Sequence, residues 1–273
     1  MANSEPIGIL RFTLSPKREL YSYKVVVRHE PGVITRICTI PELKKVDVQH
    51  LTYAPISFKK RGRVSLFLVA DFCGSGVDPE ALLEKLKRTK GVIDAELDKE
   101  IFPGLIIDDF HFPIYLMKDY RAIIVGQGML SGLLEGIRDE MGPAGEAFLY
   151  HQGFEAGKMV VDYWLPMVQS IVGIRTKREL WDAMSKVIKA LGWASIETLN
   201  WSDDGIGIRI RADGLVECQL LKRHMGSHMF RGFISGILSR LFGKELLAKE
   251  VKCISKGDEY CEFLTTEVFV GER

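Results

Sequence analysis

Near its C-terminal end the chain reads Glu250-Val251-Lys252-Cys253-Ile254-Ser255-Lys256-Gly257-Asp258-Glu259-Tyr260-Cys261-Glu262-Phe263. Glycine followed by aspartate is a common turn pair, so this stretch predicts a β-hairpin formed by residues 246–255 and 260–270. The hairpin would bring Glu250, Cys253 and Cys261 into one small volume. Two thiolates and a carboxylate are ligands that zinc uses in proteins. The residues alone leave three interpretations open: a zinc site, a disulfide, or two buried free thiols.

The composition is that of an ordinary globular protein. The chain has 273 residues, which suggests about two domains, with 47% hydrophobic and 27% charged residues. A net charge of +1 provides no global field that would attract nucleic acid or an acidic membrane surface. We find no signal peptide and no apolar run of about 20 residues, so we expect no membrane span. Five cysteines are too few for a secreted disulfide framework, which predicts a cytoplasmic protein.

Residues 1–105 are expected to form the first domain. Its pattern is strand, helix, two strands, helix, strand, which is the split βαβ arrangement. Pro41 is expected to distort or end the first helical stretch. Asp78-Pro79-Glu80 gives the second helix an acidic cap and a proline in its first turn. In chain order, the expected elements are residues 21–29, 33–45, 46–56, 63–73, 79–90 and 92–101.

This order resembles the ferredoxin-like ACT domain, in which the first strand-to-helix turn typically reads Asp-x-Pro-Gly. Here the turn reads His29-Glu30-Pro31-Gly32, with His29 in the place of the usual aspartate. The resemblance implies edge-to-edge pairing, and hence a homodimer, with an amino acid bound at the pairing interface. The backbone at Gly32 could approach a ligand because glycine has no Cβ. A tight turn without a ligand explains the same residues.

The second domain is expected to span residues 120–273, after a linker at residues 106–119. It reads as helices packed on an antiparallel sheet, so the fold class of the chain is α+β. Thr176 and Glu179 form a capping box at the start of a helix. Pro166 is expected to end or kink the preceding helix. Strands are expected at residues 193–201 and 205–212, with a further strand at 215–221.

The closing hairpin and the helix before it resemble the vinyl-4-reductase domain family, over roughly residues 120–270. Gly232 and Gly236 lie on the helix that precedes the hairpin. The resemblance implies a small-molecule-binding domain. Relatives that sense aromatic compounds hold zinc with two hairpin cysteines, a carboxylate and a third cysteine. Glu250, Cys253 and Cys261 match three of these positions, but the third cysteine would fall at Ser227. A fourth zinc ligand is therefore sought among three residues: His224, His228 and Cys218.

Aromatic side chains are concentrated in the second domain. Aromatic residues at helical spacing are usually core residues, but the resemblance implies that some of them line a ligand pocket above the sheet. The candidates for this pocket are Tyr150, Phe154, Trp164, Trp181, Trp201, Phe230 and Phe233, with Tyr163 and Trp193 nearby. His151 could supply a polar group inside it, although a surface histidine is the simpler interpretation.

The sequence favours a ligand-responsive regulatory protein that binds a small apolar or aromatic molecule. No DNA-binding motif is evident, and no residue is assigned a catalytic role. An alternative is a reductase using a nicotinamide cofactor. Its single supporting motif is Gly126-x-Gly128-x-x-x-Gly132 after a short apolar segment, and the strand with an acidic residue that this motif requires does not follow. A third interpretation is a dimerisation module without any ligand.

Overall fold

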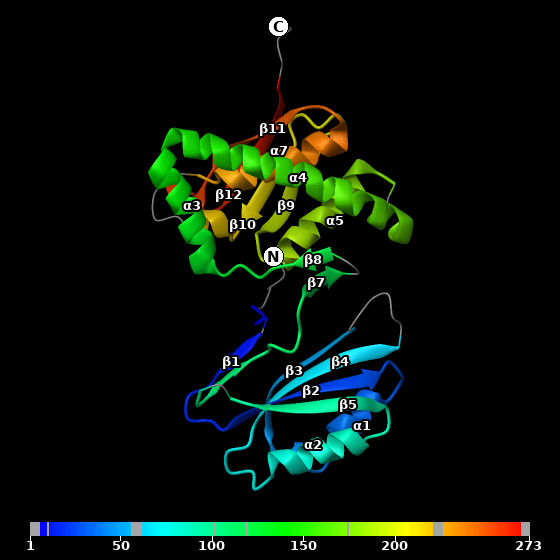
Figure 1. The fold of residues 1–273 in the computed structure, drawn as a ribbon. Coiled ribbons are helices and arrows are strands. Elements are labelled where there is room, and N and C mark those ends of the chain that lie inside the picture. The colour runs from blue at the N-terminus through cyan, green and yellow to red at the C-terminus, as the bar shows by residue number, and fades with distance from the viewer. Residues whose placement is uncertain are drawn as a thin grey trace. The chain divides into compact units, whose positions relative to one another are not determined.

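The computed structural model describes residues 6–9, 11–55, 62–100, 102–117, 120–173, 175–220 and 226–268. The chain divides into two compact units, Met1–Ile124 and Val125–Arg273. Each unit combines helices with antiparallel strands (Figure 1), which confirms the predicted mixture of helices and antiparallel sheets. Among the described residues, no helix has both the length and the apolarity needed to cross a bilayer.

The first unit is built on a four-stranded antiparallel sheet with the strand order β3-β4-β2-β5. The first helical stretch breaks around Pro41, where a short 3-10 turn, η1, follows α1 after a gap. The side chain of Asp78 accepts a hydrogen bond from the Glu80 amide and caps α2, as expected. The bounds are β2 (Leu20–Arg28), α1 (Val33–Cys38), η1 (Leu43–Lys45), β3 (Asp47–Pro55), β4 (Arg63–Asp71), α2 (Pro79–Arg88) and β5 (Val92–Lys99).

The central strand β4 is buried on both faces of this sheet, which explains why its sequence is almost continuously apolar. One face packs against α1 and α2 and contributes Leu66 and Leu68 to the main core. The opposite face contributes Phe67 and Val69 to a smaller core. Ile106 and Phe110, from the segment that follows β5, cover this second face.

The segment expected as a linker contains regular structure. Strand β6 (Leu105–Ile107) pairs with β1 (Phe12–Leu14) near the start of the chain. Strand β7 (Ile114–Met117) pairs with β8 (Tyr120–Ala122). The chain that leaves the first sheet is therefore held by strand pairing before the second unit begins.

The second unit has a four-stranded antiparallel sheet with the order β11-β12-β10-β9. The predicted capping box is confirmed, because Thr176 and Glu179 exchange both hydrogen bonds at the start of α5. The bounds are α3 (Gln127–Met141), α4 (Pro143–Val172), α5 (Lys177–Ala190), β9 (Ser195–Asn200), β10 (Arg209–Asp213), α6 (Val216–Leu220), α7 (His228–Phe242), β11 (Leu246–Lys252), η2 (Ile254–Lys256) and β12 (Cys261–Glu267).

Two local expectations for this unit are corrected. The strand expected at residues 215–221 is wrong, because Val216–Leu220 form the short helix α6. Short apolar runs fit a buried strand and a buried helix equally well, so periodicity could not separate them. Of the two outcomes expected at Pro166, an end or a kink, the end is wrong, because helix α4 continues to Val172. A proline within a helix costs a backbone hydrogen bond, which a thirty-residue helix packed along α7 can tolerate.

Helices α4 and α7 lie side by side with their backbones in contact (Figure 1). Two glycines on each helix form the contact. A Cβ atom on Gly153 would lie 2.0 Å from the carbonyl oxygen of Met229, and one on Gly236 would lie 2.0 Å from that of Phe154. Cβ atoms added to Gly157 and Gly232 would lie 2.2 and 2.1 Å from backbone oxygens of the facing helix. Glycine is thus required at all four positions because no side chain fits between the helices.

Candidate metal centre

The closing hairpin forms as predicted, from β11 and β12. Gly257 adopts φ 100 at the end of η2, a conformation that favours glycine. The Asp258 carboxylate accepts a hydrogen bond from the Cys253 amide at 2.7 Å, and the Asp258 amide donates to the Cys253 carbonyl at 3.2 Å. The turn therefore fixes the backbone of Cys253, the residue that follows β11.

An irregularity in β11 places Glu250 and Cys253 together. Residues three apart in a regular strand point to opposite faces of the sheet. The register shifts between Glu250 and Lys252, so one extra residue is accommodated there. Glu250 pairs with Phe263, and Phe263 shares a face with Cys261, two residues away. The hairpin thus directs two thiols and one carboxylate toward the same side.

Cys218, from α6, completes a group of four. One ligand atom from each of Cys218, Glu250, Cys253 and Cys261 lies within 4.8 Å of the other three. The sulfurs of Cys218 and Cys253 are 3.5 Å apart, well beyond the ~2.05 Å of a disulfide bond. Zinc–sulfur bonds of about 2.3 Å place two sulfurs of a tetrahedral site about 3.8 Å apart. Three buried thiols and a carboxylate therefore fit a four-coordinate metal ion such as zinc.

The acidities of these four groups are strongly perturbed. Hydrogen bonds with Cys218 and Cys261 lower the pKa of the Cys253 thiol. The hydrogen bond with Cys253 raises the pKa of the Cys218 thiol. Burial raises the pKa of Glu250 to about 7, although hydrogen bonds from Ser227 oppose this. A bound cation would favour the charged form of all four side chains.

Ser227, at the position where the resemblance implies a third cysteine, contacts Glu250 instead. Its hydroxyl donates to Glu250 Oε1 at 2.6 Å, and its amide donates to Oε2 at 3.2 Å. The preceding residue, Gly226, has φ 75, and a Cβ atom there would lie 2.7 Å from Glu250 Oε2. Ser227 therefore hydrogen-bonds the Glu250 carboxylate, and Gly226 packs closely against it.

Of the three candidates for the fourth ligand, the structure brings Cys218 to the hairpin. His228 begins α7, and its Nε2 lies 3.4 Å from a carboxylate oxygen of Glu146. His228 does not belong to the group of four. His224 lies outside the described residues.

Sequence reasoning missed a buried ion pair next to this centre. Arg138 of α3 donates to Glu217 of α6 at 2.8 Å, and both side chains are almost completely buried. Glu217 also accepts hydrogen bonds from the amides of Met229 and Phe230, at 3.1 and 2.7 Å. Burial raises the pKa of Glu217, while the Phe230 amide and Arg138 oppose that shift. Glu217, next to Cys218 in the sequence, thus caps the first turn of α7.

The aromatic candidates for the ligand pocket fall into separate groups. Tyr150 and Phe154 stack on α4 at 6.2 Å, and Arg231 of α7 covers the Tyr150 ring at 5.2 Å. Phe230 contacts both Phe233 and Phe263 in the core. Because α4 and α7 touch along their glycines, a ligand cannot lie between their backbones at that crossing.

The tryptophans lie elsewhere in this unit. Trp181 is fully buried and donates a hydrogen bond to Thr198 at 2.9 Å, which ties α5 to β9. Trp201 packs on Phe242 at 5.7 Å, beneath the guanidinium of Arg178. Trp164 of α4 is also buried. His151 is exposed, with its ring against that of Tyr150.

The two glycine-containing turns differ in what they can support. Gly126 precedes α3, and Gly128 and Gly132 have open space where a Cβ would stand. Every described strand pair is antiparallel, so the parallel βαβ unit of a dinucleotide site is not formed by the described residues. In the first unit, Gly32 adopts φ 80 between exposed Pro31 and the start of α1, and His29 is exposed beside Tyr53.

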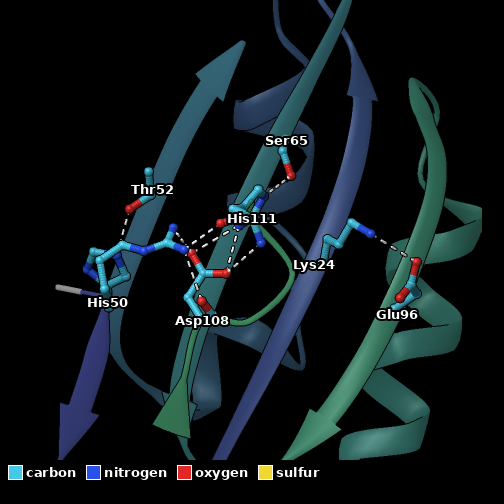
Figure 2. Close-up of polar contacts among 8 residues, drawn as sticks. Lys24, His50, Thr52, Ser65, Glu96, Asp108 and His111 are labelled. Carbon is cyan, nitrogen blue, oxygen red and sulfur yellow. Dashed lines mark hydrogen bonds and ion pairs between the residues drawn. The ribbon is translucent and has the colours of Figure 1, made fainter. Parts of the chain in front are cut away.

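A second polar cluster lies on the first unit's sheet, on the face opposite α1 and α2 (Figure 2). His111 contacts Ser65 of β4 at 2.5 Å through Nε2 and Asp108 at 2.8 Å through Nδ1. Arg11 donates to the Asp108 carboxylate at 2.5 Å and to the carbonyl of His111 at 2.6 Å. The cluster thus fixes the segment after β6 to the sheet. Because Ser65 is buried in the central strand, it is not presented as an open nucleophile.

Comparison with known proteins locates the domain in which the four-residue cluster lies. The family model of the vinyl-4-reductase domain matches residues 210–267, so a domain of this family lies in the C-terminal region of the chain. Cys218, Ser227 and all three hairpin residues of the cluster fall inside the match. The uncharacterized protein MJ0150 of Methanocaldococcus jannaschii is 24% identical over 180 residues, which cover 63% of this chain and 94% of that protein.

Two solved structures show similarity to the chain. The phenol-responsive sensory domain of the transcription activator PoxR, solved with phenol, is 16% identical with a TM-score of 0.48, over 60% of this chain and 80% of that one. A vinyl-4-reductase family protein from Methanocaldococcus jannaschii is 20% identical with a TM-score of 0.38, over 54% of this chain and 84% of that one.

Proposed function

We propose that this chain is a ligand-responsive regulatory protein whose second unit binds a small apolar or aromatic molecule and is stabilised by a zinc ion. Cys218, Glu250, Cys253 and Cys261 would hold the ion. Four protein ligands leave no open position for water, so the site would be structural and not hydrolytic. The zinc would supply no reaction; it would fix the closing hairpin against α6.

The observation that carries this proposal is the convergence of three buried thiols and one carboxylate inside the vinyl-4-reductase domain. The ligands come from α6, β11, the turn after β11 and the start of β12. Burying three thiols and a carboxylate together is unfavourable without a cation, because buried charges and unpaired polar atoms cost free energy. The family resemblance supports small-molecule binding by the same unit.

For the first unit we propose a regulatory role in which it pairs with a second copy and binds an amino acid near His29, Pro31 and Gly32. The resemblance to ACT domains and the positive φ of Gly32 support this assignment. In a cell, the chain would act in the cytoplasm. Coupling between the units would require two conformations with different ligand affinities.

Metal analysis of the full-length protein, purified under reducing conditions without chelator, tests the metal site. We expect one zinc per chain in the wild type and none in Cys253→Ser or Cys261→Ser. Cys73→Ser is the matched control, since Cys73 is an exposed cysteine far along the chain from the cluster. Absence of zinc from the wild type, even after reconstitution with excess zinc, would overturn the metal site.

Thermal unfolding in the presence of phenol and of a saturated ring alcohol tests the ligand pocket. Ligands that bind the folded state raise the unfolding midpoint in proportion to the logarithm of their concentration. We expect a midpoint increase with the aromatic compound that Phe154→Ala reduces. If neither compound nor a wider panel of aromatic molecules shifts the midpoint, the protein is better explained as a module without a ligand.

A further inference from the structure

The first turn of α7 lacks the usual side-chain cap. Ser227 occupies the N-cap position, but its side chain makes no capping hydrogen bond within the helix. Its hydroxyl is committed to Glu250 instead, at 2.6 Å. The amides of Met229 and Phe230, which a capping serine would normally serve, donate to Glu217. The helix start is therefore held by two carboxylates from outside the helix.

We propose that Ser227 is a positioning residue of the metal centre, which orients Glu250 toward the three sulfurs and makes the order of the first turn of α7 depend on metal occupancy. This inference rests on the metal site of the proposed function. It goes further by assigning a role to a residue outside the four proposed ligands.

The geometry around Glu250 explains why orientation is needed. A carboxylate on a strand can rotate and present either oxygen, so a ligand role requires that one rotamer be favoured. Ser227 contacts both oxygens, through its hydroxyl and its amide, and is completely buried. Gly226 allows this approach because any Cβ there would collide with Glu250. Hydrogen bonds of this kind to metal ligands typically change metal affinity by about 10–100-fold.

Two sets of hydrogen bonds connect the cluster to the first turn of α7. Glu250 reaches the helix start through Ser227. Cys218 reaches it through its neighbour Glu217, which binds the Met229 and Phe230 amides. Metal binding would fix both Glu250 and Cys218. The hydrogen bonds of Ser227 and of Glu217 at the first turn would then become ordered together. The second turn of the same helix carries Gly232, which contacts α4, so the first turn lies directly before the helix crossing.

The test uses the full-length protein as wild type, Ser227→Ala, Ser227→Thr and the control Ser131→Ala on α3. Zinc affinity is measured by chelator competition, the ligand environment by the visible spectrum after cobalt substitution, and order in residues 229–233 by amide exchange with and without zinc. We expect Ser227→Ala to bind zinc about 10–100-fold more weakly and to show an altered cobalt spectrum. Ser227→Thr, which keeps the hydroxyl, should restore both, and Ser131→Ala should match wild type.

In the wild type, zinc should slow amide exchange at residues 229–233, and in Ser227→Ala it should slow exchange less. Wild-type affinity and an unchanged cobalt spectrum in Ser227→Ala would overturn the positioning role while leaving the metal site intact. If Ser227→Ala does not fold, the wild type still decides, because equal exchange with and without zinc would overturn the dependence of α7 on the metal. A wild type that binds no zinc would overturn the metal site and this inference with it.

Discussion

A Cβ atom on Gly232 would lie 2.1 Å from the carbonyl oxygen of Tyr150, which is closer than any side-chain atom can approach a backbone oxygen. We therefore expect Gly232→Ala to force α7 away from α4. Overpacking of this kind usually costs about 1–3 kcal/mol, and the upper end of that range is expected here because the atoms in the way are backbone atoms of Tyr150 and Phe154. Chemical denaturation monitored by far-UV circular dichroism measures the change.

Gly136 supplies the matched control for this substitution. It also lies within a helix, α3, but a Cβ atom there would meet open space. We expect Gly136→Ala to stabilise the protein by up to about 1 kcal/mol, because alanine has the higher helix propensity. Equal effects of the two substitutions would show that the α4–α7 contact is not close-packed.

Removing the proposed metal ion should destabilise the second unit. Because the ligands lie on both sides of α7 in the sequence, we expect a strong chelator to lower the unfolding midpoint of the wild type and to leave that of Cys218→Ser unchanged. The midpoint of the wild type should recover when zinc is added back. A wild-type midpoint that does not respond to chelator would count against a structural metal ion.

The buried pair of Arg138 and Glu217 gives a double-substitution test. Arg138→Met leaves the Glu217 carboxylate buried without its partner, which typically costs about 3–5 kcal/mol. Adding Glu217→Gln removes that charge, and we expect it to recover part of the loss although the cap of α7 is weakened. Equilibrium unfolding of the wild type, Arg138→Met, Glu217→Gln and the double variant measures the coupling free energy between the two side chains. Additive effects would show that the two side chains do not interact.

The polar cluster in Figure 2 should stabilise the segment that follows β6. Substituting His111→Ala removes the contacts to Ser65 and Asp108, so we expect a loss of about 1–3 kcal/mol and faster amide exchange in residues 106–113. Glu96→Gln is the control in the same figure, because its partner Lys24 and Glu96 itself are partly exposed and such pairs contribute little. Unchanged exchange in His111→Ala would disprove the anchoring role.

The lowered pKa of the Glu179 carboxyl should make the stability of the protein depend on pH. Hydrogen bonds from the amides of Arg175 and Thr176 lower the pKa of this carboxyl below its usual 4.5. A lowered pKa means that the contribution to stability is present above the unfolded-state value and is lost as the pH falls through the folded-state value. The midpoint of wild type should therefore fall more steeply below pH 4.5 than that of Glu179→Gln. Parallel curves would contradict the capping interaction.

The features that could be predicted from the sequence are those determined by neighbouring residues. Gly257 and Asp258 specify the closing turn, and the turn brings Cys253, just after β11, close to Cys261 at the start of β12. Thr176 and Glu179 specify the start of α5 in the same way. Pro31 and Gly32 mark where β2 gives way to α1. In each case the decisive contact lies within about ten residues, so local chemistry was sufficient.

The rest depends on contacts between distant residues. Cys218 could not be chosen over His224 and His228, because the choice depends on α6, which was interpreted as a strand. The partner of Glu217 is Arg138, 79 residues earlier, and nothing in either local sequence indicates the pair. The contact of Ser227 with Glu250 could not be predicted either, because the two residues are 23 positions apart.

The order of the four ligands along the chain has a mechanical consequence. Cys218 and Cys253 are separated by 35 positions, and the whole of α7 and β11 lies between them. A metal ion joined to both would close this stretch into a ring, and a cross-link of that length lowers the entropy of the unfolded chain by an equivalent of about 4 kcal/mol. A pulling force applied at the two ends of the chain would then bypass α7, which could lengthen only after a metal–sulfur bond had broken.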